Sequence, residues 1–173
     1  MSAELFVLRL VHILGGIFWV GSGLFTAFFL MPALGRVGPA AAGPLMGALQ
    51  QRRLFTVLPV VALLTILSGV RLFQIASAGF APEYISSRTG QTFLWSGIAA
   101  VGAFLLSVLI ARPAALRAGR LGAAIATIPE EQRSARGAEV ENLRRRSAIA
   151  SIFATALLIG AAAGMAVARY VGA

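Results

Sequence analysis

The side chains with the chemistry to hold a ligand are few, and they lie inside long apolar segments. Arg9 and His12 are three positions apart in the first such segment, and Arg71 and Gln74 are three apart in the second. Residues three apart share a face of an α-helix, so each pair would present its polar groups together. Because a polar side chain is costly in hydrocarbon, all four residues are candidates for a functional site.

His12 also begins a stripe of small and aromatic residues. Gly15, Gly16, Trp19 and Gly23 follow it at i+3, i+4, i+7 and i+11, which is one face of a helix. Glycine beside an imidazole lowers the helix surface and makes room for a flat or bulky group. Two interpretations follow: a haem b held by His12, or close helix packing in which His12 is hydrogen-bonded across the interface.

A haem at this site would need further partners. Arg9 or Arg71 would pair with its propionates. A single histidine cannot supply two imidazole ligands, and Met165, near the end of the last apolar segment, is the candidate for the second axial position. Methionine more often fills a core. A five-coordinate haem and a haem shared between two chains both stay open, and His12 is also the candidate ligand for a metal ion.

The elements that would position these residues follow from composition. The chain has 173 residues, of which 58% are hydrophobic and 12% charged. Soluble domains carry about 25% charged residues, so this chain is predicted to be an integral membrane protein of one domain spanning residues 1–173. A transmembrane helix needs about 20 mostly apolar residues. Four segments qualify: 5–30, 54–78, 92–111 and 147–168. The predicted fold class is an all-α, four-helix transmembrane bundle.

Arginines set the predicted orientation. The two connections 31–53 and 112–146 hold eleven arginines, whereas the opposite side holds two, Arg88 and Arg169. This asymmetry predicts that both connections are cytoplasmic and that both termini lie on the outer, periplasmic side of a bacterial inner membrane. Arg144, Arg145 and Arg146 would contact anionic lipids of the cytoplasmic leaflet.

Two details of the connections are predicted as well. The segment 38–44, with its glycines and prolines, is expected to be a loop. Thr127 is expected to cap a cytoplasmic helix that has Pro129 in its first turn and runs directly into the last transmembrane segment.

Other classes of function find little in the sequence. Cysteine is absent, which excludes disulfides and thiolate chemistry, and no nucleophile–base constellation is visible. The net charge of +9 does not indicate nucleic acid, because no polar domain is present to display it. No catalytic residue is assigned, and whether the chain is an enzyme stays open.

The segment 10–21, LVHILGGIFWVG, followed by Met31-Pro32-Ala33-Leu34, resembles the opening helix of the CopD-like membrane family. That family includes copper-resistance membrane domains and a haem-binding protoporphyrinogen oxidase with four helices. Residues 52–55 and 67–72 are similar to the same pattern. The resemblance implies a histidine placed to bind haem or metal, which corresponds to His12.

Three functions follow as expectations. The first is a small haem-binding or redox-associated membrane protein. The second is a non-catalytic accessory subunit of a larger membrane complex or homo-oligomer. The third is metal or small-solute transport, which the small number of polar residues in the apolar segments does not favour.

Overall fold

The fold is a bundle of long helices. The computed structural model describes residues 2–125 and 129–171, apart from the side chain of residue 39, and no strand occurs in these residues. Four helices in them are long and apolar enough to cross a membrane: Ala3–Gly38, Leu54–Ala76, Arg88–Ala124 and Glu130–Val167. The predicted fold class, four apolar helices and no sheet, is confirmed.

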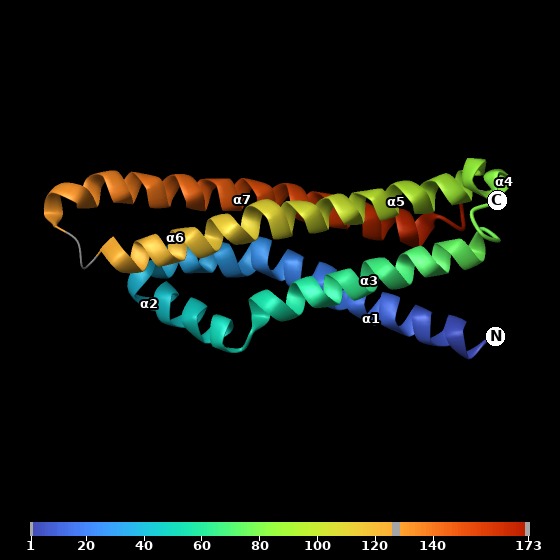
Figure 1. The fold of residues 1–173 in the computed structure, drawn as a ribbon, viewed down its shortest axis with the longest axis horizontal. Coiled ribbons are helices and arrows are strands. Elements are labelled where there is room, and N and C mark those ends of the chain that lie inside the picture. Colours follow the sequence, from blue (N-terminus) through green and yellow to red (C-terminus); the bar gives the residue numbers. More distant parts are fainter. Residues whose placement is uncertain (1, 126–128, 172–173) are drawn as a thin grey trace.

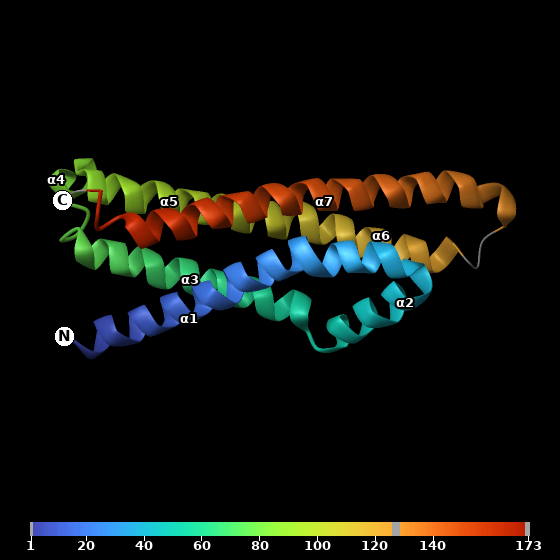
Figure 2. The ribbon, with the colours of Figure 1, turned by 180° about the vertical axis from the view of Figure 1, so that it is seen from behind.

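The helical segments follow one another with short connections. They are α1 (Ala3–Phe25), η1 (Thr26–Leu30), α2 (Met31–Gln51), α3 (Leu54–Ala76), α4 (Pro82–Ser86), α5 (Arg88–Leu105), η2 (Leu106–Ala111), α6 (Arg112–Ala124) and α7 (Glu130–Val167). Figure 1 shows both termini and the short α4 at one end of the bundle, and α2, the end of α6 and the start of α7 at the other. We call these the terminal end and the arginine-rich end. Figure 2 shows α1 and α3 lying together along one side of the bundle.

Two predicted helix ends were wrong, because a proline does not stop either helix. The first helix was expected to end before Met31-Pro32 and the third before Arg112-Pro113, but both continue. In each case a π-helical turn comes immediately before the proline: Met31 N–H bonds to Thr26 O, and Arg112 N–H bonds to Ser107 O. A proline ring collides with the carbonyl four residues earlier in a regular α-helix, and the wider π turn moves that carbonyl aside. The third helix also starts earlier than predicted, at Arg88.

The expected loop at 38–44 was also wrong. Gly38 has φ 74°, ψ 175°, a backbone conformation in which glycine has no steric penalty, and the chain is helical on both sides of it. Residues 31–37 continue the first long helix, and residues 39–51 fold back as a separate helix at the arginine-rich end (Figure 1). The turn that was expected therefore occupies one residue.

The fourth long helix begins well before its apolar part, as predicted. α7 starts at Glu130 with Pro129 as its N-cap residue and runs without a break to Val167. Thr127, the predicted cap, lies outside the described residues. Glu139 accepts from Arg117 of α6 at 3.4 Å and from Arg136 of its own helix at 3.1 Å. The Arg117–Glu139 pair connects α6 and α7 at the arginine-rich end, whereas the Arg136–Glu139 pair lies within α7.

The core of the bundle is small and made mostly of alanine. Trp19 of α1 lies at its centre, against Ala62, Ala103, Ala154 and Leu158 of the other three long helices. Its ring meets that of Phe104 edge to face, with centroids 6.4 Å apart. Most large apolar side chains of α1 and α3 point outward and are exposed. In water such a surface would promote aggregation, whereas in a bilayer the lipid tails cover it.

Candidate functional site

The candidate site lies between α1 and α3, in the half of the bundle nearer the terminal end. His12 is half-buried, and its Nδ1 lies 2.8 Å from the backbone carbonyl oxygen of Thr65. A carbonyl oxygen can only accept, so Nδ1 carries the hydrogen and donates it. In the neutral ring this leaves the lone pair on Nε2, which makes no hydrogen bond with any described residue.

The groove that receives the imidazole belongs to α3. A Cβ placed on Gly69 would lie 2.6 Å from His12 Cε1 and 3.0 Å from Nδ1, so the ring lies directly on the backbone of Gly69. Thr65 and Gly69 are four apart and form a small-residue stripe on α3. The spacing of small residues on α3 could have identified this pair, but it was overlooked.

The glycines after His12 accommodate a side chain of the neighbouring helix. A Cβ on Gly15 would collide with Thr65 Oγ1, and a Cβ on Gly16 would lie 3.8 Å from Thr65 Cγ2. Thr65 itself is buried, and its hydroxyl donates to Val61 O at 2.8 Å. The space that these glycines leave is therefore occupied by α3, as the interpretation of close helix packing expects.

Two predicted site residues lie elsewhere. Trp19 is part of the bundle core and does not extend the surface beside His12. Met165 is half-buried on α7, and no hydrogen bond joins it to His12. The contacts between α1 and α7 centre on Trp19 and Leu158, and α1 diverges from α7 toward the terminal end (Figures 1 and 2).

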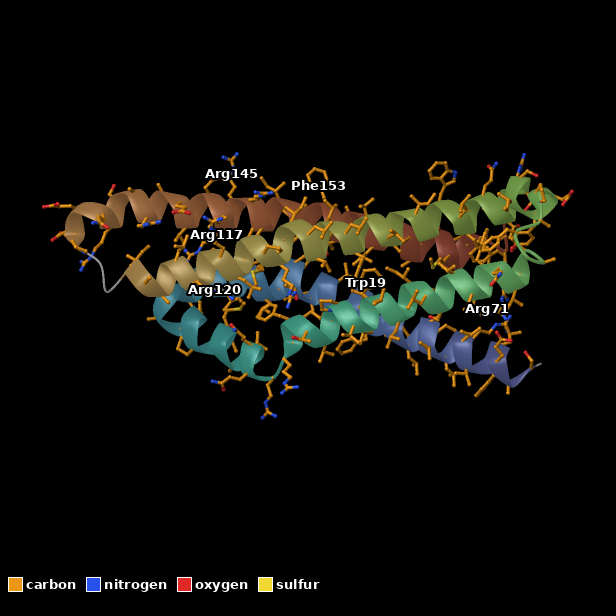
Figure 3. All side chains as sticks on the ribbon, in the orientation of Figure 1. Trp19, Arg71, Arg117, Arg120, Arg145 and Phe153 are labelled. Atoms are coloured by element: carbon orange, nitrogen blue, oxygen red, sulfur yellow. The ribbon has the colours of Figure 1, made fainter. Side chains whose placement is uncertain are left out.

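The second predicted polar pair is joined by a residue that the sequence did not single out. Arg71 of α3 pairs with Glu4 of α1 at 2.6 Å through Nη2, and its Nη1 donates to Gln74 Oε1 at 2.9 Å. Both ends of the ion pair are about half exposed, at 47% and 51%, so its contribution to stability is small. Figure 3 shows Arg71 on α3 facing the first turns of α1. Arg9 is exposed one turn before His12.

The site is therefore a contact between α1 and α3 in which Nε2 of His12 makes no hydrogen bond with any described residue. It carries cations on its terminal side, at Arg9 and Arg71. Within the described residues no three His, Cys, Asp or Glu side chains come together as a metal site would require.

Comparison with protein-family models, with curated proteins and with solved structures gives no match for this chain. The resemblance of the first helix to CopD-like proteins therefore stays a prediction.

Replacing Gly69 by alanine tests the His12 contact. The new methyl group would occupy the position of the ring edge, so the imidazole must move and the bond to Thr65 O is lost. Interhelical hydrogen bonds in membranes are worth about 0.6 kcal/mol on average and up to about 1.7. We expect Gly69→Ala to destabilise the protein by about 1–2 kcal/mol, including the displaced packing, as measured by unfolding in mixed micelles.

Gly21→Ala of α1 is the control, because a Cβ there meets nothing within 4 Å. If Gly69→Ala and Gly21→Ala had equal stability, the imidazole would not lie on Gly69.

Proposed function

We propose that this chain is a small integral membrane protein that binds one haem b through Nε2 of His12. The observation that supports this is the hydrogen bond from His12 Nδ1 to the Thr65 carbonyl. Histidines that ligate metals almost always donate their other ring N–H to a carboxylate, a backbone carbonyl or water, which fixes the tautomer and the ring orientation. His12 is already held in that way, with Nε2 available.

The remaining residues of the proposed site supply charge and surface. Arg9 and Arg71 lie on its terminal side as donors to propionates, and Arg71 would share its guanidinium between a propionate and Glu4. Because Thr65 fills the space beside Gly15, the haem would lie on the exposed side of the α1–α3 pair. Met165 would not help to hold the haem, since α1 diverges from α7 toward the terminal end (Figures 1 and 2). A haem in this position would supply one-electron redox chemistry.

The proposed setting is a bacterial inner membrane with the arginine-rich end in the cytoplasm. Eleven arginines belong to the two connections at that end, and positive charge favours the cytoplasmic side. The same charges would attract the anionic lipids of that leaflet.

Optical spectra of two His12 variants test the proposal. In asparagine, Nδ2 occupies nearly the position of the histidine Nδ1, so His12→Asn keeps a donor for Thr65 O but removes Nε2. The purified full chain, supplied with haem, is expected to show a Soret band that shifts on reduction with dithionite. His12→Asn is expected to lose that band while its free energy of unfolding stays within about 0.5 kcal/mol of the wild type. His12→Ala is expected to lose the band and also to be less stable than the wild type.

A wild-type protein that stays colourless after haem supplementation would overturn the proposal. An unchanged Soret band in His12→Asn would also do so, because the haem would then be bound through another residue.

A second candidate is a cofactor-free accessory subunit of a larger membrane complex or homo-oligomer. The observation that favours it is the packing of Thr65 against Gly15 and of His12 against Gly69, which serves helix association without any ligand. This candidate predicts a colourless protein in which His12→Asn behaves as the wild type does. What co-purifies with the chain would then identify its function.

A further inference from the structure

A groove opens on the surface of the bundle beside α7, near the arginine-rich end (Figure 3). It has a volume of about 450 Å³ and lies between α7 and the π-helical turn η2. Leu106 and Ile110 of η2 form one wall, and residues 142–153 of α7 form the other. No residue of the His12 site takes part in it.

The α7 wall changes from polar to apolar along its length. Asn142, Arg145 and Arg146 line the groove first, and Ile149 and Phe153 line it one to two turns later. Apart from the neighbours Arg145 and Arg146, successive positions are three or four apart and therefore form one stripe of the helix. Unlike an ordinary amphipathic helix, the stripe is polar at one end and apolar at the other. Figure 3 shows Arg145 and Phe153 projecting from the same side of α7.

The position of this change coincides with the start of the apolar span. The apolar part of α7 begins at about residue 147, so the guanidinium groups lie where lipid phosphates are expected and the apolar wall lies where acyl chains are expected. The bond from Ser147 Oγ to Ala111 O, at 3.0 Å, fastens α7 to η2 at this level.

The charges in the groove are not neutralised by the protein. Arg145 and Arg146 form no ion pair with any described residue, whereas Arg117 and Arg136 nearby share Glu139. Both guanidinium groups are exposed, and Asn142 adds an amide donor. An occupant of this groove must therefore carry negative charge at one end and an apolar chain at the other.

We propose that the groove binds one anionic phospholipid of the leaflet on the arginine-rich side. Its phosphate oxygens accept from Arg145, Arg146 and Asn142, and an acyl chain lies against Leu106, Ile110, Ile149 and Phe153. A soluble phosphate would leave the apolar wall uncovered, and a zwitterionic lipid would bring its own cationic group close to both arginines. The proposal does not rest on haem binding at His12.

Native mass spectrometry of the full chain in an uncharged detergent tests the proposal. Phosphatidylglycerol is titrated onto the delipidated protein, with phosphatidylcholine of the same acyl chains in parallel. We expect one tightly held phosphatidylglycerol and at least tenfold weaker retention of phosphatidylcholine. Each arginine near a membrane surface contributes about 1 kcal/mol toward anionic lipid, so Arg145→Gln with Arg146→Gln should weaken binding about 10–30-fold.

The matched control is Arg112→Gln with Arg120→Gln. It removes the same charge from the same end of the bundle, at exposed positions of α6 outside the groove. We expect it to leave the single tight site in place. Ile149→Ser with Phe153→Ser tests the apolar wall and should also weaken retention, with folding checked by circular dichroism.

Several outcomes would overturn the proposal. These are equal retention of the two lipids by the wild type, equal losses in the groove and control arginine variants, and displacement of the lipid by inorganic phosphate alone. The comparison of lipids on the wild-type protein decides the matter even where a variant does not fold.

Discussion

Replacing Gly90 by alanine is expected to lower the free energy of unfolding by about 3 kcal/mol, at the upper end of the usual cost of overpacking. Gly90 is buried in the first turn of α5, and a Cβ there would collide with the backbone carbonyl oxygen of Tyr84 in α4. A backbone atom cannot rotate away as a side chain can. The corner is also held by Ser87, whose hydroxyl donates to Tyr84 O at 2.6 Å and accepts from Gly90 N at 3.0 Å.

Unfolding of the detergent-solubilised protein in mixed micelles, followed by circular dichroism, measures this effect. Gly97→Ala on the same helix is the control, because nothing lies within 4 Å of a Cβ there. Its stability should stay within about 0.5 kcal/mol of the wild type. A Gly90→Ala protein as stable as Gly97→Ala would show that α4 does not pack on the start of α5.

Replacing Gly164 by leucine is expected to cost about 2–3 kcal/mol, because it forces α7 away from α5. A Cβ on Gly164 would collide with Ser96 Oγ and lie 3.5 Å from Ser96 Cβ and 3.9 Å from Thr92 Cγ2. The serine hydroxyl is committed to Thr92 O at 2.7 Å. Turning this hydroxyl would make room for a single methyl group, and for that reason leucine is the more decisive change.

Gly160→Leu is the matched control, one turn earlier on the same helix. Gly160 has nothing within 4 Å of a Cβ and lines an open groove with Thr92, Trp95 and Ser96. We expect it to leave the stability of the monomer almost unchanged. If both variants lost stability equally, Gly160 would also be covered, and a second chain lying in this groove would be the explanation.

The existence of the four long helices was predictable, because a run of about 20 apolar residues in so hydrophobic a chain is typical of a membrane-spanning helix. Helix ends were harder to predict. Pro32 and Pro113 each follow a residue that closes a π turn, and no local pattern distinguishes such a proline from one that ends a helix. The reversal at Gly38 was expected as a loop because glycine and proline are common there, but a single residue with positive φ is enough to make it.

Half of the candidate site could be predicted from the sequence. His12 and the glycines after it were identified by spacing alone. The partners were not identified, because the bond of His12 goes to a backbone carbonyl, which every residue has. Glu4 was overlooked because it lies just before the predicted apolar segment. In the structure it belongs to the first turn of α1 and forms an ion pair with Arg71.

α7 has 38 residues and contains no π turn or internal proline, so it is one uninterrupted helix about 57 Å long, nearly twice the hydrocarbon thickness of a bilayer. Its neighbours are different, because η1 and η2 interrupt the regular bonding of the first and third long helices and provide places to bend. We therefore expect α7 to resist bending more than the first and third long helices do. A displacement of α7 at the arginine-rich end is therefore expected to reach the terminal end of that helix, whereas bending of the first and third long helices is expected at η1 and η2.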